Sequence, residues 1–150
     1  MEIMGLPLHP LVVHAVVVLV PLAALGGIAI SAWGAARKRY GWLTVAFAAA
    51  ATGSTFVAQQ AGKAFYETFA RHTEAMDKHM ALGSGLLVWV IILFLGTVTV
   101  MLAQRLIDQQ QPRGRTVLIT GGIITVVGAV VSLVQVIRVG HSGATAVWGS

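Results

Sequence analysis

The sequence predicts an all-α integral membrane protein, a single up-down-up-down bundle of four transmembrane helices. Of its 150 residues, 57% are hydrophobic and 10% are charged, a balance that is far too apolar for an ordinary soluble domain. Four stretches carry no charge, and each supplies the ~20 residues that a helix needs to cross ~30 Å of hydrocarbon. We therefore expect one domain over residues 1–150, with spans at about 10–33, 41–61, 79–103 and 116–139.

The first span is predicted to begin at Pro10 and to bend at Pro21, because proline suits a first helical turn and removes a backbone hydrogen bond further in. No Lys or Arg precedes Arg37, so the positive region of a secretory signal is missing and we expect the segment to be retained. His14 lies about one turn inside this span. Since an imidazole is costly against lipid, we expect His14 to point into the bundle.

The second and fourth spans each carry a line of small and polar residues at helical spacing. The lines are Ala48, Thr52, Thr55 and Gln59 in the second span, and Gly121, Thr125, Gly128, Ser132 and Gln135 in the fourth. Such lines favour close helix packing, and they also leave space for a macrocycle or a quinone headgroup. The second span is the least hydrophobic, so we expect packing against the other helices to stabilise it.

The third span is predicted to continue a helix that starts near Thr73, with Thr73 as its cap and Glu74 in the favourable first turn. His72 and His79 are seven residues apart and are expected to share a face. Gly83 follows His79 by four residues and leaves bare backbone beneath the imidazole. Either a flat cofactor lies there or the glycine serves close helix packing.

The distribution of charge predicts how the bundle lies in the membrane. Basic residues crowd two loops: Arg37, Lys38 and Arg39 after the first span, and Arg105, Arg113 and Arg115 after the third. By the positive-inside rule these loops are cytoplasmic, and both termini are outside. Because the net charge of +5 is explained by these short loops, nucleic-acid binding is not expected.

All five histidines are predicted to lie at the outer end: His9, His14, His72, His79 and His141. The chain has no cysteine, which excludes disulfides, cysteine-held iron–sulfur clusters and a covalently attached haem. Two imidazoles from different helices can hold haem b, and His14 and His79 are the expected ligands. Arg138 lies where haem propionates would emerge, and its guanidinium would pair with them.

Two other readings of the histidines stay open. His9, His14, His79 and His141 could form a zinc or copper site, since imidazole suits both metals. The histidines could instead hydrogen-bond between helices in a cofactor-free accessory subunit. Hydrolase chemistry is not expected, because no serine has a nucleophile-elbow context and no acidic residue lies within a span. We expect an electron carrier more than an enzyme. Four points stay open: quinol-linked redox activity, a redox partner protein, assembly into a homo-oligomer, and the roles of His72 and His141.

The two ends of the chain resemble a known family. Residues 5–14 read Gly-Leu-Pro-Leu-His-Pro-Leu-Val-Val-His, and residues 140–148 read Gly-His-Ser-Gly-Ala-Thr-Ala-Val-Trp. They are similar to the bacterial membrane-protein family labelled domain of unknown function 2231, over nearly the whole chain. The resemblance implies four helices, a redox setting through members fused to Rieske or cytochrome c domains, and a b-type haem.

By position, the resemblance makes His9 and His14 the family's opening pair and His79 the histidine that begins its third helix. His141 departs from the commoner tail, in which the histidine comes later. Together with the charge distribution, the resemblance implies a bacterial inner membrane protein with both termini outside and electron transfer at the outer face.

Overall fold

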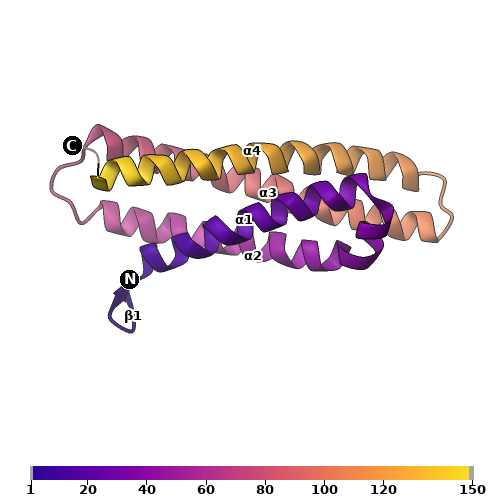
Figure 1. Cartoon of the computed structure of the whole chain (residues 1–150), viewed down its shortest axis with the longest axis horizontal. Coiled ribbons are helices and arrows are strands. Elements are labelled where there is room, and N and C mark those ends of the chain that lie inside the picture. The colour runs from indigo at the N-terminus through magenta and orange to yellow at the C-terminus, as the bar shows by residue number, and fades with distance from the viewer. Residues whose placement is uncertain (1, 149–150) are drawn as a thin grey trace.

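The computed structural model describes residues 2–148, and it forms an elongated four-helix bundle (Figure 1). The helices are α1 (Leu8–Ala32), α2 (Gly34–Tyr66), α3 (Glu74–Asp108) and α4 (Gly114–Trp148). A two-residue antiparallel pair, β1 (Glu2–Ile3) and β2 (Leu6–Pro7), precedes α1. All four helices are long and apolar enough to span a membrane, which confirms the predicted fold class.

Each helix packs against two neighbours. α1 and α3 each contact both α2 and α4 extensively, so α1 and α3 are diagonal to one another across the bundle. The starts of α1 and α3 and the ends of α2 and α4 lie together, beside both chain ends, and we call this the terminal end (Figure 1). The α1–α2 and α3–α4 connections lie at the opposite end, which we call the far end.

The connections explain where the helices stop. Trp33 alone separates α1 from α2, with extended backbone angles of φ −132° and ψ 112°. Gln110 adopts the left-handed conformation, φ 57°, in the turn between α3 and α4. Thr73 caps α3 by accepting a hydrogen bond from the backbone N–H of Met76 at 3.2 Å, which confirms the predicted cap. α1 begins at Leu8, directly after β2 and two residues before the predicted start.

Small residues let α3 and α4 approach closely. A β-carbon added to Gly96 would lie 2.9 Å from backbone atoms of Thr125, and one added to Gly128 would lie 2.9 Å from the backbone N of Leu93. In the predicted α4 line the first four residues are buried and Gln135 is half-buried. In the α2 line two residues are buried and two are half-buried. Both lines therefore face the interior, as the packing interpretation predicts.

The outer surface of the bundle is apolar along its length. Large side chains on every helix point outward, among them Leu25, Val88 and Ile123, which are 59%, 56% and 62% exposed. Such a surface suits lipid, because a helix that is apolar all round is either buried or embedded in a membrane. At the far end, Trp42 is exposed and the guanidinium of Arg105 lies 5.2 Å from its ring centroid. Aromatic and basic residues of this kind are typical of a bilayer boundary.

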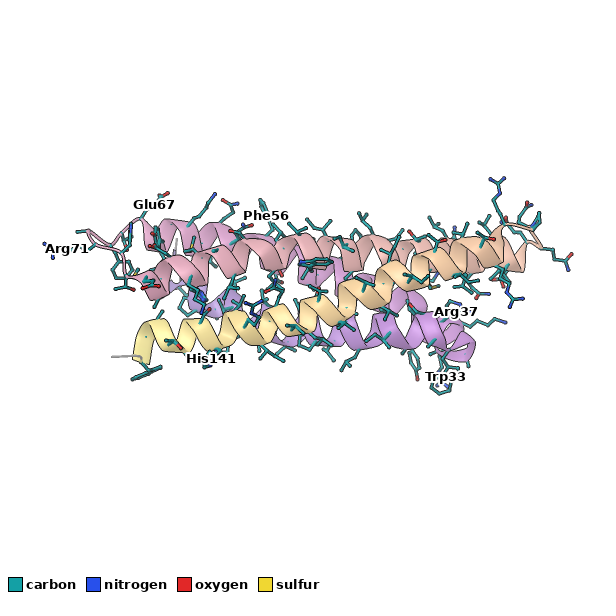
Figure 2. The ribbon with its side chains drawn as sticks, turned by 90° about the horizontal axis from the view of Figure 1, so that it is seen from above. Trp33, Arg37, Phe56, Glu67, Arg71 and His141 are labelled. Atoms are coloured by element: carbon teal, nitrogen blue, oxygen red, sulfur yellow. The ribbon has the colours of Figure 1, made fainter. Side chains whose placement is uncertain are left out.

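The far end holds a buried arginine. Arg37 Nε donates to Oε1 of Gln104 at 2.7 Å, and its Nη1 donates to the carbonyl oxygen of Ile30 at 2.8 Å. Gln104 Nε2 in turn donates to Asp108 Oδ1 at 2.8 Å, so the network joins α1, α2 and α3. The prediction that Arg37 lies in a loop is wrong. The helix α2 begins at Gly34, and its first turn directs the Arg37 side chain inward. Figure 2 shows Arg37 at the opposite end of the bundle from His141.

Candidate functional site

The histidines all lie toward the terminal end, but the structure does not bring all of them together. His9 and His14 are in the first turns of α1, His79 is in the second turn of α3, His141 is near the end of α4, and His72 precedes α3. Among residues 2–148, no group of three or more His, Asp or Glu side chains is placed to hold a metal ion. The four-histidine metal shell is therefore not assembled in the described part of the chain.

His9 docks on the end of α2. Its Nδ1 lies 3.2 Å from the carbonyl oxygen of Ala58. A β-carbon added to Gly62 would lie 3.1 Å from Cε1 of His9, so the glycine makes room for the imidazole. Phe65 lies nearly parallel to the ring, with centroids 6.2 Å apart. Because a carbonyl can only accept, Nδ1 carries the proton in the neutral ring, and Nε2 keeps its lone pair.

His79 docks on the end of α4 in the same way. Its Nδ1 lies 3.0 Å from Oγ of Ser142, and that hydroxyl donates its own proton to the carbonyl oxygen of Val139 at 2.9 Å. The hydroxyl has one proton, so it must accept from Nδ1–H of His79. A β-carbon added to Gly143 would lie 3.1 Å from Cε1 of His79. The neutral ring is again held as the Nδ1–H tautomer, with the lone pair on Nε2.

The two helical hairpins thus repeat one arrangement. In each, a histidine near the start of the first helix rests on a glycine near the end of the second, and its Nδ1 is engaged by that second helix. His9 and His79 come from the diagonal helices α1 and α3, each near the start of its helix at the terminal end. In the described residues, neither Nε2 has a hydrogen-bond partner. We call His9 and His79 the histidine pair.

The histidine pair continues the inward faces of the bundle. His9 precedes the buried Val16 by seven residues, and His79 precedes the buried Leu86 by seven, which is about two helical turns in each case. Deeper in the interior, two buried oxygens of α4 have no partner among the described residues, Ser132 Oγ and Gln135 Oε1. Buried polar atoms are normally satisfied, so this region suits a bound water or a polar ligand.

His14 lies on the opposite side of α1 from the histidine pair. Its side chain is exposed, and its Nδ1 lies 2.7 Å from the carbonyl oxygen of Pro10 in the same helix. The prediction that His14 points into the bundle is wrong. His14 follows His9 by five positions, which turns the two side chains about 140° apart around the helix axis. The bond to Pro10 satisfies one ring nitrogen locally and lowers the cost of an outward position.

His72 belongs to the connection between α2 and α3. Its ring stacks on Tyr66 with centroids 3.7 Å apart, and its Nε2 donates to the carbonyl oxygen of Tyr66 at 3.0 Å. The Tyr66 hydroxyl donates to Asp77, which ties the connection to α3. The prediction that His72 and His79 share a helix face is wrong, because α3 starts at Glu74 and His72 has no place on it.

Arg138 and His141 line a surface groove between α3 and α4 at the terminal end. The groove has a volume of about 410 Å³, and its wall includes Lys78 and Ser142 but neither member of the histidine pair. Arg138 and His141 are both exposed. The structure therefore places these two predicted site residues on a different surface from His9 and His79.

The fold and the site together define a class of protein: a multi-pass α-helical membrane protein whose bundle carries one docked imidazole in each helical hairpin at the same end. The chain belongs to the family described as Predicted membrane protein (DUF2231), whose model matches residues 5–150. The family prediction from residues 5–14 and 140–148 is thereby confirmed. Comparisons with curated proteins and with solved structures gave no match.

Proposed function

We propose that this chain is a b-type haem-binding membrane protein that carries electrons at its terminal end, with His9 and His79 as the axial ligands. One observation carries the proposal: two imidazoles on diagonal helices each engage a neighbouring helix through Nδ1, and among the described residues no hydrogen bond uses Nε2 of either ring. A b-type haem takes one nitrogen on each face of its ring. Histidines that ligate metals commonly donate the other ring N–H to a carbonyl or hydroxyl oxygen, which fixes their orientation.

The surroundings of the histidine pair fit such a group. Gly62 and Gly143 leave the rings unobstructed on the helices that hold them, and a β-carbon on Gly83, one turn below His79, would meet no atom within 4 Å. The unpartnered oxygens of Ser132 and Gln135 lie further along the α4 face that carries Ser142. A bundle interior between facing helices is a common place for a cofactor.

The number of ligands favours haem over zinc or copper. A closed tetrahedral shell needs four donors, whereas a haem iron needs two from the protein. Among the described residues, no group of three or more His, Asp or Glu is placed to hold a metal ion. His9 replaces His14 as the partner of His79 in this proposal, and Arg138 has no part in it because its side chain lies on the groove.

When bound, the haem would supply reversible one-electron chemistry, and the residues of the chain would position it. The Nε2 atoms would hold the iron, Ala58 and Ser142 would keep both rings in the ligating tautomer, and Phe65 would shield the outer side of His9. The five histidines offer no second pair at the far end. Electrons would thus enter and leave on one side of the membrane, in exchange with a quinol or a redox protein.

From the basic far end we infer that this activity lies at the outer face of a bacterial inner membrane, with both termini outside. The far end carries Arg37, Lys38 and Arg39 together with Arg105, Arg113 and Arg115, against Asp108 alone. Fusion of a reporter that is active only in the periplasm to the C-terminus tests this orientation. Reporter activity supports it, and an inactive reporter with an active cytoplasmic counterpart contradicts it.

The central test is the absorption spectrum of the protein purified after expression with ample haem precursor. We expect a Soret band and the low-spin signature of two axial histidines. His9→Ala and His79→Ala should each remove most of the bound haem, whereas His14→Ala removes the same chemical group from an exposed position and should retain it.

Two results would refute the proposal. Wild-type protein without a Soret band, but with stoichiometric zinc or copper by elemental analysis, would favour a metal site, and protein with neither would favour an accessory subunit. Loss of haem in His14→Ala with full retention in His9→Ala would show that the ligand pair is assigned wrongly.

A further inference from the structure

The groove between α3 and α4 combines basic and apolar side chains on both of its walls. Lys78, Arg138 and His141 supply its basic groups, Leu82 and Ile137 supply its apolar surface, and no Asp or Glu of the described residues lines it. Lys78 and Arg138 are exposed, and Ile137 is 70% exposed. The groove therefore combines uncompensated positive charge with open apolar surface.

The basic residues of the groove lie at or above the level of its apolar residues on both helices. α3 runs inward from the terminal end and α4 runs back toward it, so Leu82 lies one turn deeper than Lys78, and Ile137 lies one turn deeper than His141. Arg138 follows Ile137 directly, and its long side chain can extend from that level toward the end of the bundle. The basic groups of both walls can therefore meet near the end of the bundle, with apolar side chains beneath them. A phospholipid has the same order, with its phosphate at the bilayer boundary and its acyl chains below.

We propose that this groove binds an anionic phospholipid, independently of any haem. Arg138 and Lys78 contact the headgroup phosphate, for which guanidinium and ammonium groups are suited. Leu82 and Ile137 contact the first carbons of an acyl chain. A lipid fits better than a free anion because the apolar wall is continuous with the outer surface of the bundle. Ser142, which also lines the groove, places the lipid beside the hydroxyl that orients His79.

The test is the lipid composition that the full chain retains from mixed micelles with equal phosphatidylglycerol and phosphatidylcholine, measured by native mass spectrometry. We expect phosphatidylglycerol to be enriched on the wild-type protein. Each basic residue near a membrane surface contributes about fivefold in affinity for anionic lipid. Lys78→Gln and Arg138→Gln should each reduce the enrichment by about that factor, and the double variant should abolish it.

Arg113→Gln/Arg115→Gln is the matched control, because it removes the same charge from exposed positions at the far end. It should retain the enrichment. Equal retention of both lipids by the wild type, or an equal loss in the control, would overturn the proposal. Displacement of the bound phosphatidylglycerol by inorganic phosphate alone would also overturn it, because the groove would then recognise an anion and not a lipid. If the double variant loses helicity, the two exposed single variants decide the question.

Discussion

Substitution of Arg37 by Met should destabilise the bundle more than any other loss of a positive charge at the far end. The substitution keeps a long, flexible side chain and removes the donors to Gln104 Oε1 and to the carbonyl oxygen of Ile30. A hydrogen bond to a charged group contributes about 1.5–3 kcal/mol in proteins, and interhelical bonds in membranes lie at the low end of such values. Two bonds at about 1.5 kcal/mol give a loss of roughly 3 kcal/mol.

The assay is equilibrium unfolding of the purified protein in mixed detergent micelles, followed by circular dichroism. Lys38→Met is the matched control, because it removes the same charge from the adjacent, exposed position and should change stability by less than about 0.5 kcal/mol. A double-mutant cycle of Arg37→Met with Gln104→Leu should give a coupling energy of about 1 kcal/mol or more. Equal effects of Arg37→Met and Lys38→Met would refute the reasoning.

Four further substitutions test the packing, the cap and the orientation of the proposed ligand. Gly96→Ala should destabilise the bundle by about 1–3 kcal/mol, since its β-carbon would lie 2.5 Å from Oγ1 and 2.9 Å from the backbone of Thr125. Gly53→Ala, which would meet no atom within 4 Å, should be neutral or stabilising in the same unfolding assay. Thr73→Ala should cost about 1 kcal/mol through loss of the α3 cap. Ser142→Ala should weaken haem binding about 10-fold in a haem titration while it leaves the helical content unchanged, and an unaltered affinity would contradict the role of its hydroxyl.

The fold could be predicted because the bilayer leaves few alternatives. A chain that crosses hydrocarbon must satisfy its backbone internally, so four uncharged stretches of sufficient length predict four helices. The small and polar lines of the second and fourth spans correctly predicted which faces of α2 and α4 point inward. Thr73 was predictable as a cap because its hydroxyl is followed by an acidic first turn.

The buried network at the far end could not be predicted from charge alone. Arg37, Lys38 and Arg39 are equivalent in a count of basic residues, and the positive-inside rule treats them as one loop. Their difference arises from helical phase, since α2 begins at Gly34 and directs one of the three side chains toward α1 and α3. A rule that counts charges therefore predicts an orientation and cannot identify a buried contact.

The same distinction separates the two histidines of α1. Depth in the membrane favoured His14, which lies further from the helix start, but depth does not determine the face on which a side chain lies. His9 is in phase with the buried Val16 and Ala23, whereas His14 is in phase with the exposed Val18 and Leu25 of the outer surface. The sequence contained information on which face of α1 is packed, because small residues concentrate on the packed side of a membrane helix. In both hairpins, helical phase determines which histidine lies on the packed face of its helix and could hold a ligand. For this reason the proposed haem site uses His9, the first histidine of the chain.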